Sequence, residues 1–149
     1  YTQITQLLLG SSEVAEYPED EVTAEKETMM AYYLSYAEYY ASMTGLDTNT
    51  ALYYVAGISS TEELETAAEE YAYQMVKNTM IIEEIASIEG IEVTEEEYNT
   101  KALEYAVSYG YEDIASFETD FGKEELERSI LTDLVMEYLL EQAVIVDAE

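Results

Sequence analysis

Residues 59–98 read SSTEELETAAEEYAYQMVKNTMIIEEIASIEGIEVTEEEY, and they decide the fold because they encode one long helix and the start of another. Ser60 is followed three residues later by Glu63, which is the pattern of a capping box at a helix N-terminus. Helically spaced positions then predict one apolar stripe along the helix. These positions are Leu64, Ala67, Ala68, Tyr71, Met75, Thr79, Ile82, Ile85 and Ala86.

The sequence also indicates where this helix ends. Gly90 suits the left-handed backbone conformation that commonly ends a helix. Thr94 and Glu97 then form a second capping box and predict the start of the next helix. About 29 residues with a rise of 1.5 Å each predict a rod of roughly 44 Å. Such a rod buries its apolar stripe only if other helices lie along it.

The rest of the chain repeats this pattern of helical runs broken by glycine. Further helices are predicted at residues 1–9, 18–44, 49–56, 95–109, 113–121 and 123–143. Gly10 is expected to end the first of them, Pro18 to open the second, and Asp47 or Thr48 to cap the third. Seven helical segments without an alternating strand pattern predict an all-α fold. We expect one domain over residues 1–149, with a flexible tail at residues 144–149.

The predicted helix at 18–44 carries more tyrosine and methionine than a buried stripe requires. A plain core or helix–helix contact is one interpretation, and a partly exposed surface that holds unfolded chains is the other. Methionine adapts to varied partners, and tyrosine offers a large apolar face with a polar tip. Sixteen tyrosines in 149 residues favour the second interpretation. The predicted peptide-binding residues are Met29, Tyr32, Tyr33, Tyr36, Tyr40, Met43 and Tyr53.

Composition excludes several classes of function. The net charge is −29 with only five lysines and arginines, so nucleic acid and anionic membrane surfaces would be repelled and basic or unfolded polypeptides attracted. Histidine and cysteine are absent, which removes the commonest catalytic bases, nucleophiles and metal ligands. The carboxylate clusters fit solvated helix faces and caps. We therefore expect no catalytic residue, metal or cofactor, no nucleotide site, and no membrane insertion.

Residues 76–97, VKNTMIIEEIASIEGIEVTEEE, resemble the C-terminal domain of bacterial trigger factor, in which a long helix ends in a similar I-A-x-x-E-G-I-E-V run. Residues 14–22, with Pro18, resemble the short V-P segment that leads into the family's long arm helix. Residues 126–145, LERSILTDLVMEYLLEQAVI, resemble its closing helix. SurA-like periplasmic chaperones share related architecture and remain an alternative.

The resemblance implies an elongated multi-helix domain with long arm helices and apolar clefts between them. It implies an ATP-independent chaperone domain that binds unfolded or nascent polypeptides in the cytoplasm. It also implies a fragment of a larger chain, in which a ribosome-docking domain and a peptidyl-prolyl isomerase domain would lie outside these residues, so this part is not expected to be an enzyme.

Two alternatives stay open. The first is a structural or oligomerising helical module whose tyrosines close in a homodimer. The second is an exported, cell-surface-attached relative, because five basic residues are fewer than we expect in a trigger factor.

Overall fold

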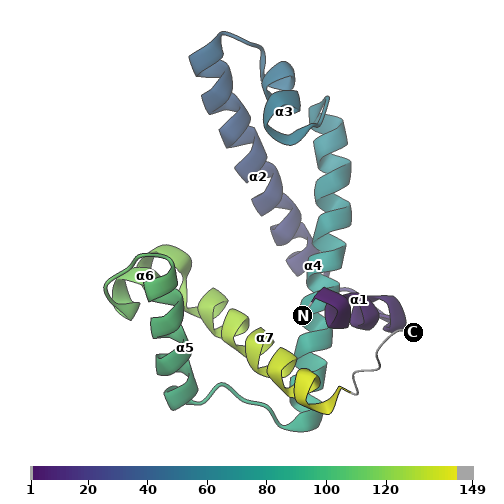
Figure 1. Ribbon diagram of the computed structural model, residues 1–149. Coiled ribbons are helices and arrows are strands. Elements are labelled where there is room, and N and C mark those ends of the chain that lie inside the picture. The colour runs from purple at the N-terminus through teal and green to yellow at the C-terminus, as the bar shows by residue number, and fades with distance from the viewer. Residues whose placement is uncertain (1, 144–149) are drawn as a thin grey trace, which may run out of the picture. The chain divides into compact units, whose positions relative to one another are not determined.

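The computed structural model describes residues 2–143, and every regular element in that range is a helix (Figure 1). The helices are α1 (Thr2–Ser11), α2 (Glu19–Thr44), α3 (Thr48–Ala56), α4 (Thr61–Glu89), α5 (Glu95–Ser108), α6 (Ile114–Phe121) and α7 (Lys123–Gln142). The all-α prediction is therefore confirmed. The predicted tail at residues 144–149 lies outside the described residues. No helix of the described chain is both long and apolar enough to cross a lipid bilayer.

Helix ends follow the local signals closely. Thr94 Oγ1 accepts a hydrogen bond from the Glu97 backbone N–H at 3.3 Å, and the Glu97 side chain accepts one from the Thr94 N–H at 2.9 Å. This confirms the capping box of α5. At the start of α4, Ser60 Oγ accepts from the Glu63 N–H at 3.2 Å, but the Glu63 carboxylate reaches back to the N–H of Ser59.

Glycine behaves as predicted at the end of α4 but not at the end of α1. Gly90 has a φ of 68°, in the left-handed region that favours glycine, and follows the last residue of α4. Gly10, by contrast, lies inside α1 with no positive φ, and the helix continues to Ser11. The prediction that Gly10 ends this helix is therefore wrong. A glycine without a competing cap weakens a helix by about 1 kcal/mol without ending it.

Over two turns of α4, the buried residues lie one position later in the sequence than the predicted ones. Ala72 and Val76 are buried, whereas Tyr71 and Met75 are 42% and 36% exposed. Leu64, Ala68, Ile82 and Ala86 are buried as expected. Both members of the Tyr71–Ala72 and Met75–Val76 pairs are apolar, so periodicity alone does not choose between them. The smaller residue of each pair turns inward.

The chain divides into two compact units. The hairpin unit comprises residues 13–79, and the terminal unit comprises residues 1–12 and 80–149 as far as these are described. The two units share α4, whose residues up to Thr79 belong to the first and whose residues from Met80 belong to the second. Whether the two act as the single domain expected from the sequence stays a prediction.

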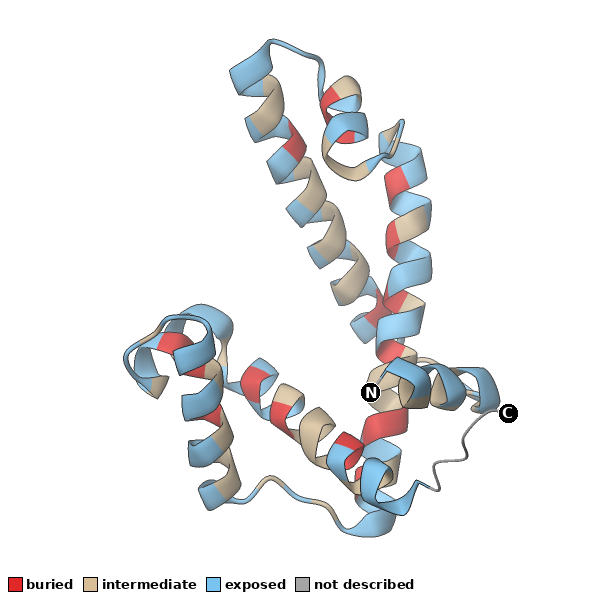
Figure 2. Cartoon of the chain, in the orientation of Figure 1, coloured by how far each residue is buried: buried red, intermediate tan, exposed pale blue. Residues whose placement is uncertain are grey.

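The hairpin unit has a small core built by α2, α3 and the start of α4. Ala37, Ala51, Leu52 and Leu64 are fully buried there. α2 is mostly exposed or half-buried along its length (Figure 2), and its only buried residues are Val22 and Ala37. Other apolar residues of α2 pack against this core but stay partly exposed, so the core leaves much of the apolar surface of α2 accessible to solvent.

The described residues of the terminal unit form two hydrophobic clusters. One is formed around Phe117, Leu126 and Ile130, with Ala102 and Ala106 of α5 packed against them. The other joins α4 to α7 through Ile82, Ala86, Val135 and Met136, with Ile4 of α1 beside them.

Tyrosine hydroxyls, rather than lysines or arginines, make most of the described polar links between elements of the terminal unit. Three of them donate a hydrogen bond to a carboxylate on another helix: Tyr98 to Glu118, Tyr105 to Asp133 at 2.8 Å and Tyr138 to Glu89 at 2.6 Å. Tyr111, in the segment between α5 and α6, donates to Asp120 of α6 at 2.9 Å. The ion pair between helices in the described part of this unit joins Lys101 Nζ to Glu137 Oε1 at 2.7 Å. A neutral donor thus satisfies carboxylates in a chain that has few cations.

Candidate functional site

α2 carries two different apolar faces. One packs into the core of the hairpin unit and is formed by Met30, Leu34, Ala37 and Ala41. The other is formed by the predicted residues of α2. Successive helical residues are about 100° apart, so this second face is centred roughly 120° around the helix from the first. Two members of this second face, Tyr33 and Tyr40, also pack against the core, but the core does not account for the others.

The second face, together with Tyr53 of α3, is called here the tyrosine–methionine surface; it comprises Met29, Tyr32, Tyr33, Tyr36, Tyr40, Met43 and Tyr53. Four of its side chains are exposed: Tyr32 by 65%, Tyr36 by 51%, Met43 by 69% and Tyr53 by 58%. Met29, Tyr33 and Tyr40 are half-buried, and the two tyrosines among them also border the core. One edge of the surface is therefore packed against the core, and the other, the open edge, is exposed to solvent.

Ring contacts connect parts of this surface. Tyr32 meets Tyr33 edge to face, with ring centroids 5.2 Å apart. Tyr54 of α3 lies 6.1 Å from Tyr53 and 6.2 Å from Tyr40 of α2, again between ring centroids. Tyr54 thereby brings together two predicted residues, Tyr40 and Tyr53, that belong to different helices. Such pairs hold the rings in place without removing them from solvent.

A cleft of about 340 Å³ opens at one end of the surface. It is lined by Glu25, Thr28, Met29, Tyr32 and Tyr33 of α2 and by Tyr71 of α4. The lining is therefore mostly aromatic and thioether-bearing, with residues from both α2 and α4, and it includes two polar residues of α2. An apolar hollow with a few polar groups is the usual form of a ligand pocket.

Several exposed residues of this region were not among the predicted peptide-binding residues. Tyr39 and Tyr54 are 62% and 65% exposed, and Tyr71 lines the cleft although it was assigned to the buried stripe of α4. Tyr39 and Tyr54 each stand next to a predicted residue in the sequence, so the density of tyrosine was the available signal. The terminal unit also exposes large apolar side chains, among them Ile88, Val107 and Tyr109.

The electrostatic setting of the hairpin unit is acidic. Its cations are Lys26 and Lys77, among many carboxylates. Asp47 caps α3, and hydrogen bonds from the Thr50 hydroxyl and backbone N–H lower the pKa of this carboxyl below its usual range. The described residues contain no group of three or more acidic, histidine or cysteine side chains arranged to hold a metal ion.

These features define a class: an all-α protein in which a helical hairpin presents more aromatic and methionine surface than its own core covers. The family model described as the C-terminus of bacterial trigger factor protein matches residues 2–145. The chain therefore belongs to the trigger factor C-terminal family, and the resemblance noted in residues 76–97 is confirmed.

Two proteins similar to this chain are named trigger factor. The chain is 36% identical over 102 residues to the trigger factor of Clostridium botulinum (strain Loch Maree / Type A3), covering 66% of this chain and 23% of that protein. It is 32% identical over 105 residues to the trigger factor of Clostridium kluyveri (strain ATCC 8527), covering 68% of this chain and 24% of that protein. The chain thus spans about a quarter of the length of the curated relatives it matches. No solved structure matches it.

Proposed function

We propose that this chain is an ATP-independent chaperone domain that holds unfolded or nascent polypeptide segments on the tyrosine–methionine surface. Membership of the trigger factor C-terminal family supports a chaperone role. The observation that carries the assignment to this surface is the exposure of Tyr32, Tyr36, Met43 and Tyr53, each more than half accessible to solvent. Exposed apolar patches of this kind usually mark interaction sites.

The chemistry of the surface suits a partner of variable sequence. Methionine is unbranched and polarisable, so Met29 and Met43 repack around different side chains. Tyrosine supplies contact area at low entropic cost, and its hydroxyl stays hydrated or pairs with a peptide carbonyl. Each contact is weak, but many contacts spread over two helices retain an extended chain. Release then requires only dissociation, without nucleotide hydrolysis.

The competing function is an oligomerising module in which two copies close on the tyrosine–methionine surface. Charge argues against it, because two copies that each carry a net charge of −29 repel one another. A homodimer would have to bury this surface against that repulsion. Light scattering at physiological ionic strength, where this repulsion is partly screened, separates the two functions: a monomer that binds unfolded protein supports the chaperone, and a stable dimer without such affinity supports the module.

A direct test measures suppression of aggregation of a reduced, unfolded protein in the absence of nucleotide. Replacing Tyr33 or Tyr40 would disturb the core that they border, so the test variant is the triple substitution Tyr32→Ser, Tyr36→Ser and Met43→Ser. The matched control is Ile88→Ser, Leu103→Ser and Val107→Ser, which removes three comparably exposed apolar side chains from the terminal unit. Circular dichroism first verifies that both variants are folded.

We expect the first triple variant to lose most of its holding activity and the control to keep most of it. Equal activity of the first variant and the unaltered chain would show that clients do not use this surface. Equal loss in both variants would show that exposed apolar area anywhere on the chain is sufficient.

The larger protein is part of the same proposal. The ribosome-docking and peptidyl-prolyl isomerase domains implied by the family resemblance would lie outside this chain, and the cytoplasm is the proposed compartment. Fractionation of the source cells tests the compartment. Protein found attached to the cell surface would contradict the cytoplasmic location.

A further inference from the structure

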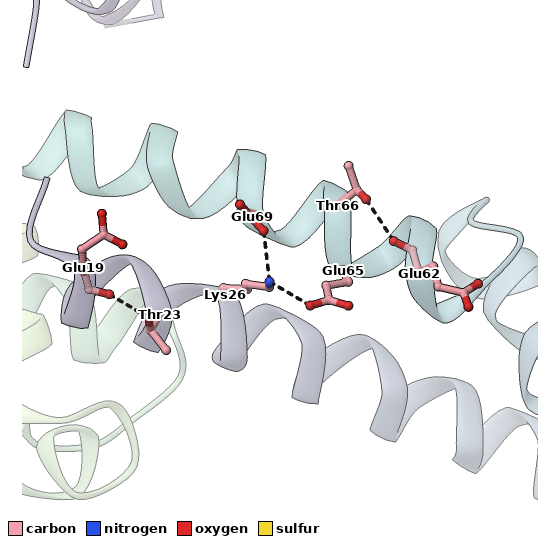
Figure 3. A network of polar contacts seen from close by, with 7 residues as sticks. All are labelled: Glu19, Thr23, Lys26, Glu62, Glu65, Thr66 and Glu69. Atoms are coloured by element: carbon pink, nitrogen blue, oxygen red, sulfur yellow. Dashed lines mark hydrogen bonds and ion pairs between the residues drawn. The ribbon is translucent and has the colours of Figure 1, made fainter.

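Lys26 connects α2 to α4 in the hairpin unit through two carboxylates (Figure 3). Its Nζ lies 3.0 Å from Glu65 Oε1 and 3.1 Å from Glu69 Oε2. Glu65 and Glu69 are four residues apart, so they stand on adjacent turns of the same face of α4. The Lys26 side chain is only 22% exposed, which fixes its alkyl stem while both carboxylates remain in contact with water.

This link lies beside the cleft of the tyrosine–methionine surface. The cleft takes Glu25, Thr28 and Met29 from the turns around Lys26, and Tyr71 from the turn that follows Glu69. On both helices, the residues that line the cleft are thus close in sequence to the residues that form the ion pairs. The backbone of α2 packs closely on α3 but not along α4, so side chains set the spacing between the two cleft walls.

Without the cation, the same place would be repulsive. Glu25 and Glu27 flank Lys26 on α2, while Glu65 and Glu69 face it from α4. The hydrogen bond to Glu65, followed by that to Glu69, raises the pKa of Lys26 above its ordinary value, because both carboxylates stabilise its charged form. One positive charge therefore offsets like charges on two helices that form one binding cleft.

We propose that Lys26 is a positioning residue that holds α4 against α2 and so sets the width of the cleft formed by Met29, Tyr32, Tyr33 and Tyr71. The inference rests on the proposed function, because it makes the ion pairs a determinant of how a client's apolar side chain is held between both walls. When the cation is removed, carboxylate repulsion moves Tyr71 away from the α2 wall and a bound apolar group loses one of its two contacts.

The first experiment measures the spacing without any client. The chain contains no cysteine, so Ala31→Cys and Gln74→Cys place two spin labels on exposed positions of α2 and α4 without changing the charge. In this labelled background, Lys26→Met removes the charge and keeps an apolar stem of similar length. We expect a longer and broader distance distribution at low salt that returns toward the original one at about 1 M salt, where the Debye length is about 3 Å.

The second experiment measures affinity for a short, blocked, uncharged peptide rich in phenylalanine and leucine, so that salt acts on the protein and not on the probe. We expect Lys26→Met to weaken binding about threefold at low salt, consistent with two solvent-accessible ion pairs. Salt should strengthen binding to the variant by screening the repulsion, and weaken binding to the unaltered chain by screening the ion pairs.

Lys101→Met is the matched control, because Lys101 makes an equally enclosed ion pair with Glu137 in the terminal unit. It should change neither the label spacing nor the peptide affinity. An unchanged distance distribution in Lys26→Met overturns the proposed spacing role even if the peptide binds. Failure of the unaltered chain to bind the peptide would instead count against the proposed function, while the distance measurement still decides the role of Lys26.

Discussion

Replacing Tyr98 by phenylalanine tests whether tyrosine–carboxylate hydrogen bonds hold the terminal unit together. Phenylalanine keeps the ring that packs against the cluster around Phe117 and keeps the Lys123 ammonium, which lies 5.3 Å from the ring centroid. Only the hydroxyl that donates to Glu118 is lost. Hydrogen bonds to charged groups contribute about 1.5–3 kcal/mol, but both side chains here are only half-buried, so water replaces part of the loss. The expected cost is about 1–2 kcal/mol of unfolding free energy.

The same hydrogen bond predicts a dependence on alkaline pH. Burial, and then the hydrogen bond to Glu118, raises the pKa of Tyr98 in the folded chain, whereas the unfolded value is about 10. A raised folded pKa means that the contribution to stability is complete below about pH 10 and is lost as the pH rises through the folded value. The stability difference between the unaltered chain and Tyr98→Phe should therefore shrink above about pH 10.

Urea unfolding followed by circular dichroism gives the free energies, and amide hydrogen exchange shows whether α5 and α6 carry the loss. Tyr32→Phe serves as the control, because this exposed hydroxyl lies on the open edge of the tyrosine–methionine surface and its removal should cost less than about 0.5 kcal/mol. The reasoning is refuted if the two substitutions cost the same at pH 7, or if the cost of Tyr98→Phe is constant up to pH 11.

Two further substitutions test the cap and the core. Thr94→Ala should destabilise the start of α5 by about 1 kcal/mol. It should also raise the pKa of Glu97, which the Thr94 hydroxyl lowers, and an NMR titration showing no rise would contradict the cap. Leu52→Ala removes a fully buried side chain from the hairpin core and should cost about 2.7–5 kcal/mol. Hydrogen exchange should localise that loss to α2 and α3, and equal deprotection of α6 would show that the two units open together.

Local signals made the element order predictable. The pair Thr94 and Glu97 specifies a helix start within four residues, and Gly90 specifies the preceding end, because both act through hydrogen bonds or backbone angles of neighbouring residues. The Glu63 side chain shows the limit of such signals. It bonds to the N–H of Ser59 rather than that of Ser60, a choice set by the course of the chain before α4.

The candidate site was predictable in part for the same reason. The crowding of tyrosine and methionine on α2 is a property of the sequence, and it indicated surplus apolar area. Which of these side chains remain exposed depends on what α3 and α4 cover, and the sequence does not state that. Tyr36 and Ala37 are adjacent and both apolar, yet one is 51% exposed and the other is fully buried.

By itself, then, the sequence determined that the chain is helical, where most helices begin and end, and that it is similar to the trigger factor C-terminal family. Tertiary structure decided which of two adjacent apolar residues turns inward, as at Tyr71 and Ala72. It also decided which carboxylates receive the hydroxyls of tyrosines such as Tyr138, which bonds to Glu89. The physical reason is range: caps and turns act over three or four residues, whereas burial and pairing depend on segments that only the folded chain brings together.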